Sequence, residues 1–157
     1  MKWWEENYRT VGDLLVQLIQ IPSVNPDGDP GTSAENTGEA AIAQCVGGLL
    51  EGLGAEVAFD EVEPDRPNVI GRFPGGENKP AVLLAPHLDT VGVGGMTIDP
   101  FGGERRDGRI YGRGACDTKG TMAAMLWALA ELGAARIAEL DIGVTFVGFM
   151  GEETGQP

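Results

Sequence analysis

The segment Ala81–Asp89 reads AVLLAPHLD and joins two kinds of sequence. Its first five residues are continuously apolar, which is typical of a β-strand that is buried on both faces. Its second half contains His87, the only histidine of the chain, and Asp89. The segment therefore predicts a central strand that carries polar side chains into the loop at its carboxyl end.

Apolar patterns on both sides of this segment predict helices that alternate with strands. Side chains at helical spacing predict three helices, over residues 10–21, 34–53 and 121–132. Short apolar runs predict further strands, over residues 55–59, 68–73, 109–111 and 142–150. We therefore expect an α/β fold, a layered domain with a mixed central sheet flanked by helices.

Length and charge narrow the class of protein. A chain of 157 residues fits one domain and can bury a core without disulfide or metal support. The formal net charge of −13 argues against nucleic acid and anionic membranes as partners, because both need a basic surface. We find no signal peptide and no apolar run that approaches a membrane span, so we expect a cytoplasmic protein.

Two cysteines are too few for the disulfide framework of a secreted protein. Cys45 lies on the apolar stripe of the second predicted helix, which indicates a core residue. Cys116 lies beside Asp117 and allows two interpretations, a small filler residue or a thiolate metal ligand.

Chemically active side chains fall at three predicted strand ends or helix starts. His87 follows the first buried strand, Asp117 precedes the third helix, and Glu152 and Glu153 follow the last strand. Ligand sites of open α/β sheets lie just beyond the carboxyl ends of the strands. Imidazole and carboxylate groups bind divalent metals, so these three loops predict a metal site.

The tripeptide 87–89 supports this prediction. Residues i and i+2 of an extended chain share a face, so Asp89 can accept a hydrogen bond from one imidazole nitrogen of His87. The other nitrogen is then free to bind a metal. A histidine that is capped and faces solvent is the alternative that these residues leave open.

The glycine-rich segment 112–120, GRGACDTKG, fits two nucleotide-binding motifs poorly. The dinucleotide motif needs a glycine where Asp117 stands, and this carboxylate would repel a pyrophosphate. The phosphate-binding P-loop needs glycine before lysine, but Lys119 precedes Gly120. We therefore interpret the segment as a tight turn that presents Asp117.

The adjacent acids Glu152 and Glu153 complete the candidate set. One carboxylate could bind a metal while the other stays free to move a proton. A pair that is merely solvated is the alternative.

Together, HLDTV at 87–91, GRGxxDxKG at 112–120 and the pair Glu152-Glu153 resemble the M20 family of metallopeptidases and deacylases. The resemblance implies the catalytic domain of a zinc exopeptidase. It also implies two divalent metal ions, with zinc expected and cobalt or manganese as alternatives. The implied reaction is hydrolysis of an amide bond in an N-acyl amino acid or a small peptide.

The resemblance also assigns roles to single residues. It implies that His87 binds one metal, Asp117 bridges both metals, and Glu153 binds the second. It implies that Glu152 is the general base that activates a metal-bridging water, and that Asp89 orients His87. It further implies a cis peptide bond directly after Asp117.

The sequence departs from the family in its extent. Relatives carry a further acidic ligand and a second histidine downstream, and an inserted lid or dimerisation domain, none of which occurs here. We therefore expect residues 1–157 to be the amino-terminal portion of a metallohydrolase catalytic domain that binds zinc weakly and is inactive alone. The full-length protein would be the enzyme, and it could be a homodimer.

Three alternatives remain at this point. The first is a truncated or non-catalytic relative that keeps the fold and binds metal weakly. The second is a complete minimal enzyme that builds its site across a homodimer, with His87 supplied by both subunits. The third is a nucleotide-binding α/β protein, which both failed glycine motifs disfavour.

Overall fold

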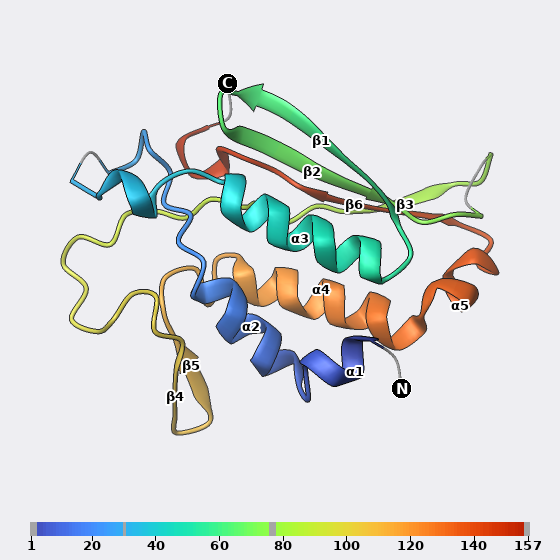
Figure 1. Cartoon of the computed structure of the whole chain (residues 1–157), viewed down its shortest axis with the longest axis horizontal. Coiled ribbons are helices and arrows are strands. Elements are labelled where there is room, and N and C mark those ends of the chain that lie inside the picture. Colours follow the sequence, from blue (N-terminus) through green and yellow to red (C-terminus); the bar gives the residue numbers. More distant parts are fainter. Residues whose placement is uncertain (1–2, 30, 76–77, 156–157) are drawn as a thin grey trace.

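The computed structural model describes residues 3–29, 31–75 and 78–155 and contains a mixed four-stranded sheet. Its strands lie in the order β1 (Glu56–Glu63), β2 (Arg66–Arg72), β6 (Gly143–Gly148) and β3 (Ala81–Leu84), as Figure 1 shows. Only β3 and β6 are parallel; the other two pairings are antiparallel. The predicted mixed sheet is therefore confirmed.

The principal helices form layers on one side of the sheet (Figure 1). Helices α3 (Ala40–Gly52) and α4 (Lys119–Leu132) lie nearest to the strands, and α2 (Val11–Ile19) packs on α4. The shorter helices α1 (Trp3–Asn7) and α5 (Ala134–Ala138) flank this layer. Within the described residues, no helix is both long enough and apolar enough to cross a membrane.

The remaining short elements lie in connecting segments. Strands β4 (Glu104–Arg106) and β5 (Arg109–Tyr111) form a separate antiparallel hairpin. Two single 3₁₀ turns are η1 (Ala34–Asn36) and η2 (Glu152–Thr154). The second of these directly follows β6 and carries both candidate glutamates.

The core lies between the sheet and the helices because strand residues alternate between the two faces. Val69 and Gly71 of β2 and Phe146 of β6 point to the helix side, where Val69 and Phe146 are fully buried. A Cβ atom on Gly71 would lie 2.9 Å from a methyl group of Leu50. The missing side chain therefore allows α3 to pack closely on β2.

The helix predicted over residues 34–53 was wrong in its first part. The structure has the 3₁₀ turn η1, a break, and then α3, which begins at Ala40. The break occurs because Gly38 has a φ angle of +87° and donates its amide hydrogen to the carbonyl of Val24 at 2.9 Å. This tertiary contact directs the chain away from helical geometry before residue 40.

The strand predicted over residues 81–85 exists, but its predicted burial on both faces was wrong. Strand β3 lies at the edge of the sheet and has a single neighbour, β6. Val82 and Leu83 are 42% and 56% exposed. Beside this edge, β3 and α4 border an apolar groove of about 450 Å³ that Leu84, Met125 and Leu132 help to line.

The other predicted elements agree with the structure within a few residues. Thr10 caps α2, and its amide donates to the Asp13 carboxylate at 2.7 Å. Helix α4 begins at Lys119, two residues before the predicted start. Strand β6 occupies the centre of the sheet, as expected for the apolar run 142–150.

Candidate metal centre

The parallel strands β3 and β6 deliver the candidate side chains to one end of the sheet. Their pairing continues beyond the regular strands, since the amide of Leu88 donates to Phe149 and the amide of Phe149 donates to Pro86. An isolated bridge also joins His87 to Phe149. This irregular extension places His87 next to the turn that carries Glu152 and Glu153.

Three predicted metal ligands converge in space. His87, Asp117 and Glu153 each offer one ligand atom, and these atoms lie within 4.8 Å of one another. Nε2 of His87 is 3.0 Å from Oδ1 of Asp117 and 3.8 Å from Oε2 of Glu152. The imidazole is nearly buried, whereas the Asp117 side chain is 77% exposed. The cluster is therefore open on one side, and its nitrogen and oxygen donors are of the kinds that zinc binds.

Asp89 is the buried centre of the polar contacts behind these ligands. Its Oδ1 lies 3.3 Å from Nδ1 of His87, which leaves Nε2 to face the other ligands. Both carboxylate oxygens also accept backbone amides, at 3.1 Å from Glu152 and 3.0 Å from Glu153. Asp89 thus connects the imidazole to the acidic turn, a contact that the sequence did not predict.

Asn25 is a second residue that sequence reasoning missed. Its side-chain amide donates to Oδ2 of Asp89 at 2.8 Å and to Oγ1 of Thr154 at 3.0 Å, and the residue is fully buried. Asn25 lies in a polar stretch of the sequence, where nothing distinguishes it from its neighbours. A buried amide that holds a buried carboxylate fixes the carboxylate's orientation.

The charges of the cluster shift its pKa values. Burial disfavours the imidazolium, but hydrogen bonds with Asp89 and Asp117 outweigh this effect and raise the pKa of His87 to about 9. For Asp89, burial acts to raise the pKa, but hydrogen bonds from His87 and Asn25 leave it below its usual value. Burial raises the pKa of Glu153 despite the opposing charge of His87. An imidazole with this pKa is protonated at neutral pH.

The segment that presents Asp117 is anchored by a buried lysine. Lys119 is 1% exposed, and its Nζ donates to the carbonyl of Ile21 at 2.7 Å. Burial lowers the pKa of Lys119 to about 7. Gly114 has a φ angle of +78°, and a Cβ there would lie 3.0 Å from Cδ of Lys119. The peptide bond between Asp117 and Thr118 is cis, as the resemblance implied.

A hollow of about 430 Å³ adjoins the ligands. Asp117 and Glu153 form part of its wall, and Ile98 and Ile110 contribute apolar surface. Cys116 also lines the hollow, but its thiol is not among the converging ligands of the described residues. The structure therefore supports Cys116 as a wall residue rather than a metal ligand.

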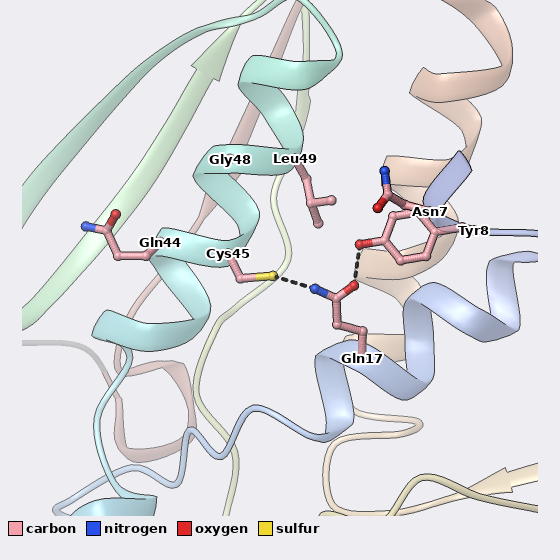
Figure 2. Close-up of a pocket in the computed structure, with 7 residues that line it drawn as sticks. All are labelled: Asn7, Tyr8, Gln17, Gln44, Cys45, Gly48 and Leu49. Carbon is pink, nitrogen blue, oxygen red and sulfur yellow. Dashed lines mark hydrogen bonds between the residues drawn. The ribbon is translucent and has the colours of Figure 1, made fainter. Parts of the chain in front are cut away.

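A second hollow, of about 410 Å³, lies between α2 and α3 (Figure 2). There the Tyr8 hydroxyl donates to Oε1 of Gln17, and Nε2 of Gln17 donates to the Cys45 sulfur at 3.5 Å. Burial raises the pKa of the Cys45 thiol, which keeps it protonated. Cys45 packs against the core, as the sequence predicted.

The fold is shared with solved structures of peptidases. The chain superposes on human carnosine dipeptidase 1 with a TM-score of 0.68 and 25% identity, covering 88% of this chain and 32% of that one. It superposes equally well, at 0.68 and 26% identity, on the M20 family metallo-carboxypeptidase Sso-CP2 from Sulfolobus solfataricus, covering 86% of this chain and 29% of that one.

Sequence comparisons identify the family. Residues 83–156 match the model of peptidase family M20/M25/M40. The chain belongs to this family, as its motifs predicted. It is 40% identical over 124 residues to a succinyl-diaminopimelate desuccinylase of Gluconacetobacter diazotrophicus, covering 76% of this chain and 29% of that protein.

A second relative matches a longer part of the chain. The succinyl-diaminopimelate desuccinylase of Methylobacterium radiotolerans is 35% identical over 144 residues, covering 90% of this chain and 34% of that protein. The chain therefore spans about a third of the length of these curated relatives.

Proposed function

We propose that the protein containing this chain is a metal-dependent hydrolase that cleaves an amide bond of an N-acyl amino acid or a small peptide. The observation that carries the proposal is the convergence of His87, Asp117 and Glu153 within 4.8 Å at the edge of a hollow. The names of the matched relatives, desuccinylase and dipeptidase, support hydrolysis of this kind of bond.

The same three residues would hold the metal. His87 would bind one ion through Nε2, Glu153 would bind a second, and Asp117 would bridge them, which its exposed carboxylate allows. Two zinc ions suit these donors best, with cobalt or manganese as alternatives. When bound, such ions polarise the scissile carbonyl and lower the pKa of a coordinated water.

Glu152 would act as the general base. Its carboxylate is more than half exposed, and Oε2 lies 3.8 Å from Nε2 of His87, so it faces the metal ligands. A carboxylate in this place can accept a proton from water and return it to the leaving amine. Asp89 would hold His87 with Nε2 directed at the metal and would fix the amides of both glutamates.

The hollow beside the ligands supports a small substrate. Its volume of about 430 Å³ lies within the usual range for small-molecule sites, and its apolar wall could contact an acyl chain. Arg113 also lines this hollow and could face a substrate carboxylate.

We further propose that residues 1–157 form the amino-terminal portion of the catalytic domain, because the chain spans 29% to 34% of two desuccinylase relatives. The chain alone would then bind zinc weakly and lack measurable turnover. The remaining catalytic segment, the lid or dimerisation domain and a possible homodimer would belong to the full-length protein. The cytoplasmic location expected from the sequence stays a prediction.

The test is a comparison of Glu152→Gln with Glu153→Gln in the full-length protein. N-succinyl and N-acetyl amino acids and dipeptides serve as substrates, and bound zinc is measured on the same samples. Glu152→Gln should keep the metal and lose about 10²- to 10⁴-fold in rate. Glu153→Gln should instead lose metal. The reverse pattern would exchange the two roles, and activity that is independent of metal would contradict the proposed function.

A further inference from the structure

The turn after β6 is held by side chains at four consecutive amides. The backbone amide of Met150 donates to the side-chain oxygen of Asn68 at 3.0 Å, and that of Gly151 donates to the Glu39 carboxylate at 3.1 Å. The amides of Glu152 and Glu153 donate to the Asp89 carboxylate at 3.1 Å and 3.0 Å. Side chains from three separate parts of the chain therefore determine where the two candidate glutamates emerge. Asp89 belongs to the proposed site, but Glu39 and Asn68 lie outside it.

Glu39 is the least expected of these acceptors, since its side chain is completely buried. Arg66 compensates the buried charge with two hydrogen bonds of 2.8 Å, from Nε to Oε2 and from Nη2 to Oε1. The third nitrogen, Nη1, contacts Glu63 at 2.6 Å and Asp27 at 3.2 Å. A bidentate pair of this kind fixes the plane of the carboxylate, and thus the direction of the oxygen that accepts from Gly151.

The position of the Gly151 amide determines where the next two residues, Glu152 and Glu153, lie. Gly151 adopts a left-handed conformation with a φ angle of +73°, and Glu152 and Glu153 follow at once. The two chain segments meet because β2 and β6 are antiparallel, so the beginning of β2 lies beside the end of β6. Arg66 and Asn68 both come from that end of β2 and are two residues apart, on the same face of the strand.

We propose that Arg66 and Glu39 are positioning residues for the metal centre, which act through the Gly151 amide to orient the Glu152–Glu153 turn. Neither side chain belongs to the metal-binding cluster or lines the hollow beside it. This inference rests on the proposed metal function, because its effect is expressed as metal affinity. We call Arg66, Glu39 and the Gly151 amide the Arg66–Glu39 clamp.

Two substitutions at Glu39 distinguish its role as the acceptor for the Gly151 amide from the packing of its side-chain volume. Glu39→Gln keeps an oxygen that can accept from Gly151, whereas Glu39→Met keeps similar volume and loses the acceptor. The matched control is Arg105→Met, which breaks the exposed pair of Arg105 and Asp13 at 2.6 Å. This control pair also joins two separate parts of the chain, but neither member touches the metal ligands.

The experiment measures zinc affinity of the purified 157-residue chain by competition with a chelator, with folding checked by circular dichroism. Glu39→Met should weaken zinc binding by about 10- to 100-fold, as loss of supporting contacts does elsewhere. Glu39→Gln should recover most of this loss, and Arg105→Met should bind like the unsubstituted chain. A folded Glu39→Met variant with unchanged affinity would overturn the proposal, as would an equal loss in the control.

Hydrogen exchange of backbone amides tests the Arg66–Glu39 clamp in the unsubstituted chain, so this test does not depend on whether a variant folds. The Gly151 amide donates to a buried carboxylate, whereas the Asp65 amide donates to the exposed Glu61 at 3.0 Å. Nuclear magnetic resonance should show exchange at Gly151 slower by about 100-fold or more. Equal exchange rates would overturn the clamp. Failure of the unsubstituted chain to bind zinc would contradict the zinc binding proposed for this chain instead, and the exchange rates would still decide this inference.

Discussion

The carboxyl end of β6 and the edge strand β3 lie in one sheet but have opposite surroundings. At the end of β6, the buried side chains of Glu39 and Asp89 and the half-buried side chain of Asn68 accept from four consecutive amides. Arg66 compensates the charge of Glu39. At β3, an apolar strand exposes Val82 and Leu83 beside an apolar groove. The polar end depends on specific geometry inside the chain, whereas the apolar edge is an open surface of the kind that pairs with other strands.

This contrast teaches that the polarity of a segment alone does not indicate whether its residues are held by contacts inside the molecule or lie exposed. The acidic turn looks like solvated surface in the sequence, yet its backbone is fixed by Asp89 and Glu39. The most apolar segment of the sequence has the more exposed side chains. The predictions below test first the polar end, then the ligands it supports, and finally the edge.

Removal of the Arg66 charge should have the largest effect on stability. Arg66→Met leaves Glu39 buried without its partner, and breaking a buried pair in this way costs about 3–5 kcal/mol. Urea unfolding of the chain should show this loss, while Arg105→Met should change stability by less than about 1 kcal/mol. The double variant Arg66→Met/Glu39→Gln should recover part of the loss. Equal effects of the two single substitutions would show that the polar end has no special rigidity.

Substitution of Asp89 should weaken zinc binding through the loss of contacts to His87 and to the acidic turn. Asp89→Ala removes the partner of His87 and the acceptor of two amides, and it leaves the Asn25 side chain without one acceptor. Zinc affinity should fall by about 10- to 100-fold. Titration against a chelator measures this fall, and Asp60→Ala on β1 is an exposed acidic control. An unchanged affinity would separate Asp89 from the metal site.

The raised pKa of His87 predicts how zinc binding depends on pH. Below its pKa of about 9 the imidazole carries a proton that competes with the metal, so affinity should rise toward pH 9 by up to about tenfold per pH unit. A flat dependence between pH 6 and pH 9 would contradict His87 as a ligand.

The same pKa shift predicts the sign of a stability change in the metal-free chain. The folded pKa of about 9 lies above the ordinary value of 6.5. The stabilisation is therefore fully present below about pH 6.5 and is lost as the pH rises through 9. His87→Asn should accordingly destabilise the chain more at pH 6 than at pH 10, as measured by thermal unfolding at both values. The opposite order would show that the imidazole is not stabilised by Asp89 and Asp117.

The edge strand should give the smallest change in stability and a visible change in association. Leu83→Lys adds a charge at a side chain that is 56% exposed, so stability should change by about 0.5 kcal/mol or less. Any self-association of the chain should weaken, because a charged edge disfavours strand pairing. Sedimentation at several concentrations measures this, with Glu56→Lys on the opposite edge strand as the control. A large loss of stability would show that β3 is packed more tightly than its exposure indicates.

The convergence of the three candidate ligands could be predicted from the sequence because their positions are local. His87, Asp117 and Glu153 each follow or precede an element with a clear apolar pattern, and strand ends meet at one edge of a sheet. Their supporting residues could not be predicted. Asn25 and Glu39 become partners only when loops distant in sequence fold over the strand ends, and no periodic pattern marks them.

The errors in the predicted fold have the same origin. A continuous apolar run such as 81–85 indicates a strand, but it does not specify how many strands and helices surround it. The false helix start at residue 34 arose because the bond between Gly38 and Val24 is a tertiary contact. Local pattern predicted the longer helices and most of the strands but not the short elements α1, β4 and α5. Contacts between distant segments determined the boundaries and the exposure of the predicted elements.

The most direct test is diffraction at the zinc absorption edge from crystals of the zinc-loaded chain. The account predicts anomalous density about 2.0–2.2 Å from Nε2 of His87 and from a carboxylate oxygen of Asp117 or Glu153. Crystals of His87→Ala grown under the same conditions should lose this density. Zinc bound only elsewhere on the acidic surface, or an undiminished peak in His87→Ala, would contradict the metal centre on which the proposed function depends.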